Sequence, residues 1–463
     1  MDQEKEIHVL FVSLCYRGHI NPMVRFAKLL ISKGLHVTLA TTNNARDRLL
    51  NGWASEANLI NFEFFDDGLE DEVDRDINLN ILLEDYLPTL GADNLSNLMI
   101  SLEGKGKKFA CMVNNCFVPW VTKVAAKHNI PCSMLWIQSC ATYGIFYHYH
   151  KSPSLFNPLN DPNNTFNIPG LPLLKTHDLP TVILPSSPPH FINVILETMN
   201  ILDQYKWVFG SSFYELEDSV ITSMLQFKPI IPIGPLVSPN MLRVTEDAPD
   251  DEEESDICIS WLDKQGTSSV IYIALGSISV LSQNETDALA MALESDSNRR
   301  FLWVRKEGEK GWGRKMGELP KGFMENTKAR GLIVPWCCQE KVLMHPSIKC
   351  FLTHCGWNST LETITAGVPV IAYPDWTDQT TDAKLLVDVF KVGVRMRKSN
   401  SCELDREEIE RCLVEVSEGP TALDIKEQAN KWKEAARNAI SNNGSSYVNI
   451  EKFVNELKNK IIE

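Results

Sequence analysis

The stretch of sequence that decides the fold runs from Trp336 to Gln379 and is WCCQEKVLMHPSIKCFLTHCGWNSTLETITAGVPVIAYPDWTDQ. Residues 350–353 form an apolar run that is typical of a short buried parallel strand. Residues 354–359 predict a turn, and residues 360–366 carry a helical pattern. Gly367 is expected to end this helix, and a second apolar run at residues 368–373 predicts the next strand. The order of strand, turn, helix and strand predicts an α/β fold with a parallel sheet.

The turn into this helix has the chemistry of an anion site. Either Asn358 or Ser359 is expected to cap the helix with its side chain. The free N–H groups of the first helical turn, together with the positive end of the helix dipole, favour a bound diphosphate. The sequence therefore predicts that the diphosphate of a nucleotide binds at this turn.

The same stretch resembles the signature box of plant secondary-product glycosyltransferases, which use UDP-sugars to modify small molecules. It fills the 44 positions of that box without a gap. A helix-capping turn alone occurs in many α/β proteins, whereas Trp, Gln, HCGWNS, Glu and a closing Asp-Gln at fixed spacing are specific. The wider similarity covers essentially the whole chain. The resemblance implies the GT-B architecture, in which two Rossmann-like parallel-sheet domains face each other across a cleft.

The resemblance also implies which residues bind the donor, UDP-glucose. They divide among its parts as follows: Trp336 stacks on uracil, Gln339 reaches the nucleoside and Glu362 binds the ribose; His354, Asn358 and Ser359 hold the diphosphate; Trp357, Asp378 and Gln379 face the sugar; and Ser277, after the strand-like residues 270–275, completes the donor site.

Three of these assignments have structural alternatives, and the alternative for His354 is a satisfied core histidine. Trp336 ends the strand-like residues 331–336, which places it at the carboxyl edge of a parallel sheet, where ligands bind in open α/β sheets; the alternative is a core tryptophan. Ser359 and Glu362 also form the Ser-x-x-Glu pattern of a capping box. A ribose contact needs only one carboxylate oxygen, so both roles of Glu362 are compatible.

We expect no metal ion. His354 could bind a metal ion together with Cys350 and Cys355, but the sequence has no second Cys/His pair at the spacing of a zinc site. Residues 74–76 form an Asp-Arg-Asp pattern, which chelates a cation in glycosyltransferases of another fold. This pattern lies in the acidic residues 66–76, which are more typical of a solvated loop. We expect the helix terminus and His354 to meet the charge of the leaving group instead.

The catalytic base is expected to be His19. Residues 7–14 predict a strand, 15–20 a loop, and the segment from Asn21 and Pro22 to Lys33 a helix with proline at its start. The motif GHINP resembles the family motif whose histidine is the general base, although a histidine in such a place is more often structural.

Asn115 departs from the family pattern. The family pairs the histidine with the aspartate of Asp-x-Phe-x-Pro-Trp, and Asn115 stands at that position in residues 111–120. An amide can accept a hydrogen bond from His19, but it cannot stabilise an imidazolium as a carboxylate does.

Two aromatic residues, Phe117 and Tyr143, are expected to contact the acceptor. Tyr143 belongs to a cluster with Phe146, Tyr147 and Tyr149 that equally fits a helix core.

We expect inverting transfer of glucose to a hydroxyl of a small phenolic metabolite, with glucose ester formation on an aromatic acid as the alternative. A phenol with a pKa of about 10 needs a base at neutral pH, whereas a carboxylic acid with a pKa of about 4 is already ionised. A nucleotide-sugar-binding module without catalysis is less favoured, because His19 and the closing Asp378-Gln379 are intact. An epimerase would need NAD and a GxGxxG motif that the chain lacks.

Length and charge agree with these expectations. A chain of 463 residues predicts two domains: 1–244 for the acceptor, an acidic linker 245–256, 257–440 for the UDP-sugar, and a helix 441–463 that returns to the first domain. The net charge of -15 argues against nucleic acid as a partner. No leader-like segment or run long enough to span a membrane occurs, and the 12 cysteines show no disulfide framework. We expect a soluble, cytoplasmic monomer.

Overall fold

The computed structural model describes residues 6–46, 59–70, 73–75, 78–242, 256–276, 279–305, 310–311, 314–397 and 404–462. The chain forms two compact units, the first from residues 1–236 with 438–463 and the second from residues 237–437. The sequence placed the change of domain at 245–256 and the return at 441. Residues 245–255 lie outside the described part of the chain, and Asp256 caps the first helix after them.

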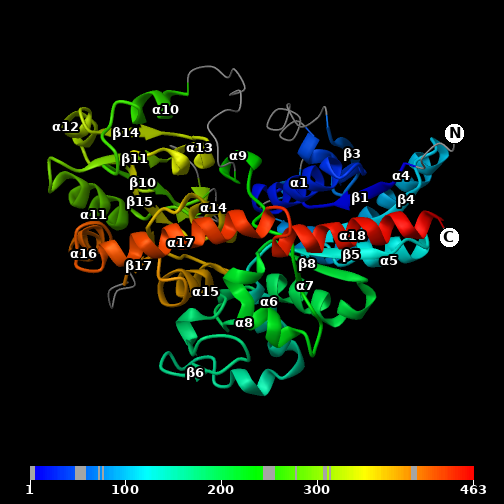
Figure 1. The fold of residues 1–463 in the computed structure, drawn as a ribbon. Coiled ribbons are helices and arrows are strands. Elements are labelled where there is room, and N and C mark those ends of the chain that lie inside the picture. The colour runs from blue at the N-terminus through cyan, green and yellow to red at the C-terminus, as the bar shows by residue number, and fades with distance from the viewer. Residues whose placement is uncertain are drawn as a thin grey trace. The chain divides into compact units, whose positions relative to one another are not determined.

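The first unit is built on a seven-stranded parallel sheet in the order β3-β2-β1-β4-β5-β8-β9 (Figure 1). The strands are β1 His8–Val12, β2 His36–Thr42, β3 Asn61–Phe65, β4 Phe109–Asn115, β5 Cys132–Trp136, β8 Trp207–Gly210 and β9 Ile231–Pro232, and a separate hairpin pairs β6 Thr165–Phe166 with β7 Leu174–Lys175. Central strands such as β1 and β5 are almost fully buried, as expected of a parallel sheet with helices on its faces.

The helices of the first unit are α1 Arg17–Ser32, α3 Leu79–Ile81, α4 Ala92–Gly104, α5 Val121–Lys127, α6 Cys140–Lys151, α7 Pro189–Asn200, α8 Tyr214–Met224 and α18 Ser445–Ile462, and a π-helix η3 spans Leu82–Gly91. The prediction that the first helix begins at Asn21 and Pro22 is wrong. Helix α1 begins at Arg17, and Pro22 lies inside it. His19 therefore lies in the first turn of α1 rather than in a loop.

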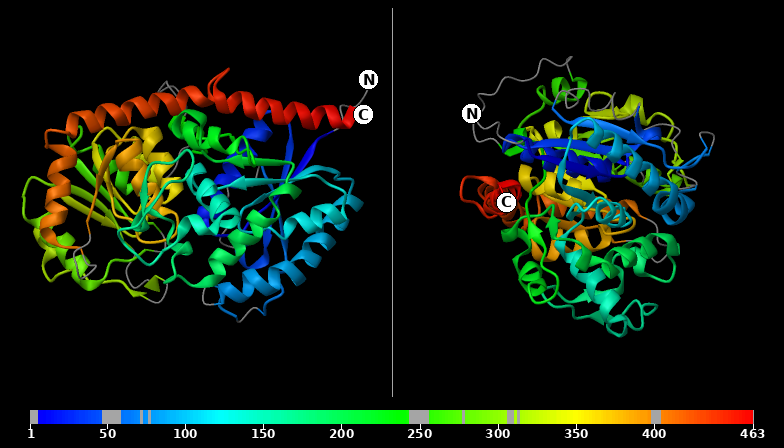
Figure 2. Two further views of the ribbon diagram at one scale, coloured as in Figure 1. Left: turned by 90° about the horizontal axis from the view of Figure 1, so that it is seen from below. Right: turned by 90° about the vertical axis from the view of Figure 1, so that its right-hand side faces the viewer.

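The C-terminal segment forms two helices, α17 Ala422–Ile440 and α18, and α18 corresponds to the helix expected at residues 441–463. Helix α18 belongs to the first unit and packs on its strands (Figure 2). The ring of Phe453 is 2% exposed and lies 4.8 Å from Phe209 and 5.0 Å from Trp207, measured between ring centroids. A salt bridge joins Lys33 to Glu451 on the same helix. The last residues of the chain thus complete the first domain.

The second unit contains a six-stranded parallel sheet in the order β14-β11-β10-β15-β16-β17. Its strands are β10 Val270–Ala274, β11 Arg300–Val304, β14 Gly331–Val334, β15 Ile348–Thr353, β16 Val370–Ala372 and β17 Gly393–Arg395, with a hairpin of β12 Lys310–Gly311 and β13 Arg314–Lys315. Its helices are α9 Pro239–Leu242, α10 Ile257–Leu262, α11 Gln283–Glu294, α12 Phe323–Thr327, α13 Gln339–Met344, α14 Trp357–Ala366, α15 Gln379–Lys384, α16 Arg406–Ser417 and most of α17, and the π-helix η8 Leu385–Val389 follows α15.

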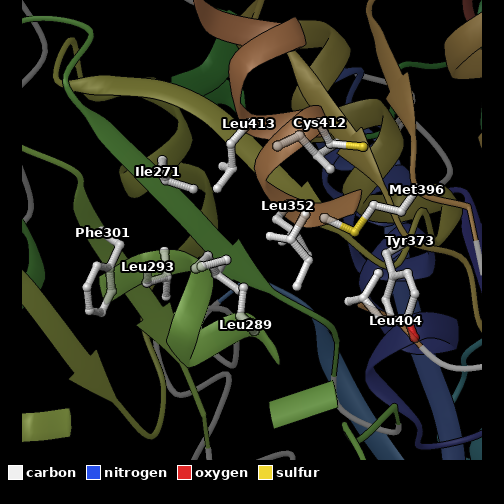
Figure 3. Close-up of a cluster of buried hydrophobic side chains, with 14 of the residues drawn as sticks. Ile271, Leu289, Leu293, Phe301, Leu352, Tyr373, Met396, Leu404, Cys412 and Leu413 are labelled. Carbon is white, nitrogen blue, oxygen red and sulfur yellow. The ribbon is translucent and has the colours of Figure 1, made fainter. Parts of the chain in front are cut away.

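Side chains of β10 alternate between the two faces of this sheet. Ile271 and Ile273 join the cluster of apolar side chains from α11, α16 and the neighbouring strands that is drawn in Figure 3. Between them, Tyr272 points to the opposite face, where it stacks on Phe351 at 4.6 Å between ring centroids. The two parallel sheets confirm the prediction of two Rossmann-like domains. None of the helices in the described residues is long and apolar enough to cross a membrane.

Candidate functional site

Trp336 stands just beyond the carboxyl end of β14, at the edge of the sheet of the second unit. Its side chain is 56% exposed, although large aromatic residues are usually buried. Exposure at the carboxyl edge of a parallel sheet favours a stacking surface for a planar ligand and excludes the alternative of a core tryptophan.

Gln339, Ser359 and Glu362 form one hydrogen-bonded group. The amide Nε2 of Gln339, at the start of α13, donates to Glu362 Oε2 at 2.7 Å and to Ser359 Oγ at 2.8 Å. Glu362 is only 5% exposed, so the amide offsets part of the cost of burying its carboxylate. The structure thus joins three residues that the sequence assigned to the nucleoside, the ribose and the diphosphate.

The first turn of α14 has no side-chain cap. The helix begins at Trp357 and its N-cap is Gly356, so the prediction that Asn358 or Ser359 caps it is wrong. The capping-box alternative for Ser359 and Glu362 is excluded for the same reason. No side chain occupies the cap position, and the N–H groups of this turn are therefore placed to meet an external anion. Gly367 ends the helix with a left-handed φ of 70°, as predicted.

His354 precedes this turn and lies between two glycines. A Cβ atom added to either Gly276 or Gly356 would lie 2.6 Å from His354 Nε2, so both positions require glycine if the ring is to keep its place. The Nδ1 atom of His354 is buried and has no hydrogen-bond partner among the residues that the structure describes. Burial lowers the pKa of His354 to about 4, while Asp375 acts in the opposite direction. A neutral imidazole at this turn can donate a hydrogen bond from one nitrogen.

Cys355 and Thr377 are residues of the same segment with left-handed backbone. Cys355 has a φ of 67°, and Thr377 has a φ of 54°, which is unusual for a β-branched residue. A hydrogen bond of 3.1 Å from the Cys355 N–H to Thr353 Oγ1 stabilises the left-handed conformation of Cys355. Such backbone strain clusters at ligand-binding sites, and here it flanks His354 and Asp378.

Asp378 and Gln379 lie at the start of α15 and are 8% and 6% exposed. Burial raises the pKa of Asp378, and its Oδ1 accepts a hydrogen bond of 2.6 Å from Thr377. Gln379 Oε1 accepts hydrogen bonds from the backbone of Asp375 and Trp376 at 3.0 and 3.2 Å, which directs the Nε2 end of the amide away from this loop. The side chain of Trp357, the third residue expected at the sugar, is 3% exposed, and its contact with the sugar stays a prediction.

The expected base in the other unit has a different setting. His19 is partly exposed, but its Nδ1 atom is buried and has no hydrogen-bond partner in the described part of the chain. The ring of Phe117 lies 4.7 Å from the His19 ring between centroids. Burial lowers the pKa of His19 to about 4, so the imidazole is neutral at pH 7.

The side chain of Asn115 forms its hydrogen bonds with Ser13 and Phe117 and not with His19, contrary to the role the sequence suggested. Its Oδ1 accepts from the Phe117 N–H at 2.9 Å, and its Nδ2 donates to Ser13 Oγ at 2.9 Å. The backbone donor fixes the orientation of the amide. Ser13 in turn donates to Leu14 O at 2.9 Å. Asn115 therefore orders the loop that carries Phe117 and leaves His19 without the carboxylate that the family pattern provides.

Comparisons with known proteins agree with this geometry. A sequence model described as UDP-glucoronosyl and UDP-glucosyl transferase matches residues 221–422. The chain is 44% identical to UDP-glycosyltransferase 84B1 of Arabidopsis thaliana over 98% of both chains. It belongs to the UDP-glycosyltransferase family. Gallate 1-beta-glucosyltransferase 84A24 of Punica granatum is 39% identical over 100% of this chain and 91% of its own length. Among solved structures, Os79 from O. sativa in complex with UDP has a TM-score of 0.84 and 28% identity, covering 97% of this chain and 100% of its own.

Membership of the UDP-glycosyltransferase family confirms the GT-B fold class and makes the chain an enzyme. One acceptor prediction nevertheless fails on the structure. Tyr143 is 0% exposed, and its hydroxyl donates to Lys228 O at 3.1 Å, so the helix-core alternative describes it. Phe117 lies beside His19, and its expected contact with the acceptor stays a prediction.

Two further predictions concern residues that the structure does not describe. Ser277, expected to bind the donor, and Asp76, part of the Asp-Arg-Asp pattern, both lie outside the described residues. In the rest of the chain, as far as it is described, no group of three or more His, Cys, Asp or Glu side chains is arranged to hold a metal ion. Sequence reasoning also missed Tyr272, whose hydroxyl bonds to Gln339.

Proposed function

We propose that this UDP-glycosyltransferase transfers glucose from UDP-glucose to the carboxylate of a small aromatic acid, which gives a 1-O-β-glucose ester. The observation that carries this proposal is the setting of His19, a neutral imidazole with a pKa of about 4 whose Nδ1 has no hydrogen-bond partner among the described residues. Such a group is a weak base. An aromatic acid is already ionised at neutral pH and needs no base, whereas a phenol does. The similarity to a gallate 1-beta-glucosyltransferase supports the same acceptor class.

The donor is proposed to bind along the segment from Trp336 to Gln379. The exposed Trp336 stacks on uracil, while Gln339 and Glu362 bind the nucleoside. The uncapped turn of α14 with His354 holds the diphosphate. Asp378 and the Nε2 end of Gln379, which follow this turn in the sequence, bind the glucose hydroxyls. We therefore expect UDP-glucose to be used faster than UDP-galactose.

The proposed reaction is a single displacement. A carboxylate oxygen of the acceptor forms a bond to C1 of glucose as the bond from C1 to the diphosphate oxygen breaks, and the electron pair of that bond leaves with UDP. Inversion at C1 converts the α-linked donor into a β-linked product. The N–H groups of the α14 turn stabilise the charge that develops on the diphosphate.

Phenol glucosylation is the second candidate function. It is favoured by the retained His19, whose ring faces the aromatic side chain of Phe117. In this case His19 removes the phenol proton as the glucosidic bond forms. The weak basicity of His19 predicts that phenols are the poorer acceptors.

A direct test is to incubate the purified protein with UDP-glucose and matched pairs of aromatic acids and phenols of similar shape. We expect products that mild alkali hydrolyses, as it does glucose esters but not phenol glucosides. Alkali-stable products from all acceptors would favour the phenol function. No turnover with any acceptor, in a protein that binds UDP, would indicate a catalytically inactive binding module.

The reaction should not require a metal ion. We propose that the helix terminus and His354 meet the charge of the diphosphate, so activity should persist at unchanged rate in excess EDTA. The measurement is the initial rate with and without the chelator and with added magnesium or manganese. Strict dependence on either ion would instead favour a cation site at Asp74 and Asp76.

Asn115→Asp should change the two acceptor classes unequally. A carboxylate at this position keeps the bond from the Phe117 N–H, and it introduces a negative charge beside the loop that contacts His19. This charge raises the pKa of His19 and stabilises its imidazolium, so kcat/KM for a phenol should rise about tenfold. For an aromatic acid, kcat/KM should stay level or fall, because the added charge repels a carboxylate.

The comparison for this variant is kcat/KM of the wild type and Asn115→Asp with one phenol and one acid. An equal change for both acceptors would show that residue 115 does not act through His19.

We also propose that the enzyme works as a monomer in the cytoplasm. The described cysteines form no disulfide with one another and most of them are buried, which suits a reducing compartment. Its acidic composition gives no support for nucleic acid as a partner. Light scattering of the purified protein and fractionation of expressing cells test the two statements.

A further inference from the structure

Tyr272 is a buried residue whose hydroxyl reaches the nucleoside end of the proposed donor site. It lies in the middle of β10 and is 1% exposed. Its hydroxyl donates to Gln339 Oε1 at 3.2 Å and lies 3.3 Å from Cys337 Sγ. Burial raises the pKa of Tyr272 well above its ordinary value, so the hydroxyl keeps its proton. Phe351 stacks on the ring and fixes the direction of the hydroxyl.

This hydroxyl determines what the other end of the Gln339 amide does. With Oε1 held by Tyr272, Nε2 points at Glu362 Oε2, 2.7 Å away, and at Ser359 Oγ, 2.8 Å away. The reversed amide would place its oxygen against the carboxylate oxygen of Glu362, and two acceptors would face each other. The chain of contacts from Tyr272 through Gln339 to Glu362 is therefore consistent only with the observed orientation.

We infer that Tyr272 is a positioning residue that acts through Gln339 to hold the Glu362 carboxylate against the ribose of a ribonucleoside diphosphate. The inference rests on the proposed function, in which Glu362 binds the ribose. Tyr272 itself touches no substrate, because its side chain is buried behind Gln339 and Cys337. Loss of the Tyr272 hydroxyl should therefore weaken binding of the ribose hydroxyls rather than binding of the diphosphate.

The test compares the binding of UDP and 2′-deoxy-UDP to the whole protein by calorimetry. The wild type should prefer UDP, because a carboxylate held in place rejects a ribose that lacks a hydroxyl. Tyr272→Phe removes one oxygen and keeps the stacked ring. It should weaken UDP binding about threefold to tenfold, which is the effect of one lost hydrogen bond, and leave 2′-deoxy-UDP binding nearly unchanged. At saturating UDP-glucose, kcat should stay within about twofold of the wild type.

Two control variants and one variant of the same link separate this role from a general structural one. Tyr143→Phe also removes a buried tyrosine hydroxyl, in the other unit, and should leave the ratio of the two affinities unchanged. Cys337→Ala removes the other neighbour of the Tyr272 hydroxyl and should leave it unchanged as well. Gln339→Leu breaks the same link from its other side and should lower the ratio, and Tyr272→Phe added to it should lower it no further.

The outcomes distinguish the inference from the proposed function. If Tyr272→Phe weakens both ligands equally, or if Gln339→Leu keeps the wild-type ratio, the positioning role is wrong while the donor site stands. If the wild type binds both ligands equally, Glu362 does not bind the ribose, and the proposed nucleoside site and the inference both fail. The thermal midpoint of each variant verifies its fold, and the Gln339→Leu result decides the matter if Tyr272→Phe is unstable.

Discussion

Replacing His19 with alanine should reduce kcat/KM for a phenol by about a hundredfold to ten-thousandfold, which is the usual contribution of a general base. The same variant should reduce kcat/KM for an aromatic acid by less than about tenfold, because an ionised acceptor needs no base. UDP binding should be unchanged, because His19 belongs to the first unit and the proposed donor residues belong to the second. The measurements are kcat/KM for both acceptors and the Kd for UDP.

The pH dependence of the wild type gives a second test of His19. Burial lowers its pKa from the ordinary value of 6.5 to about 4, so the imidazole stays neutral and able to accept a proton down to that pH. Phenol turnover should therefore show no loss of base between pH values of about 7 and 5. Loss of activity with a midpoint at the ordinary value would contradict a buried, neutral base. Near-normal phenol turnover by His19→Ala would contradict the assignment of the base itself.

Replacing Gly356 with alanine should weaken UDP binding by about tenfold to a hundredfold. The new Cβ would lie 2.6 Å from Nε2 of His354, and the far end of that side chain moves more easily than the backbone. The fold should survive while His354 leaves the diphosphate turn and loses a hydrogen bond to a charged group. The measurement is the Kd for UDP together with the thermal midpoint.

Gly266→Ala is the matched control in the same unit. Its added Cβ would meet nothing closer than Ser269 Oγ at 3.9 Å, so UDP affinity should not change. A further variant, His354→Ala, should lose affinity to a similar extent, and adding Gly356→Ala to it should have little further effect. A large additional loss in the double variant would show that Gly356 acts through the helix terminus and not through His354.

The order of elements around the donor site was predictable from sequence, while the start of its helix was not. Apolar runs and the glycine after residue 366 predicted β15, α14 and β16 in their correct order. The helix begins three residues earlier than its apolar pattern suggested, because Gly356 occupies the N-cap without a side-chain hydrogen bond. Capping preferences are typical of helices in which a side chain satisfies the first N–H groups. They do not apply to a helix whose first N–H groups bind an anion.

Contacts between distant residues could not be predicted from one sequence. Asn115 stands at the position of the family aspartate, yet its amide bonds to Ser13, 102 residues away in the chain. Tyr272 and Gln339 are 67 residues apart, and the apolar pattern of β10 marks Tyr272 only as a core residue. The aromatic cluster around Tyr143 matched a pocket and a core equally well, and only its burial separates the two.

The placement of α18 in the first domain has a consequence for synthesis of the protein. Phe453 packs against Phe209 and Trp207, and Asn449 donates to Pro232 O at 2.8 Å. These partners leave the ribosome more than 200 residues before α18 does, as the separation of 217 between Asn449 and Pro232 shows. The domain that is translated first therefore cannot complete its fold until the second domain has been made, and until then it exposes an apolar surface. A nascent chain stalled or cut before α18 would expose that surface, which makes it a natural target for chaperones and proteases.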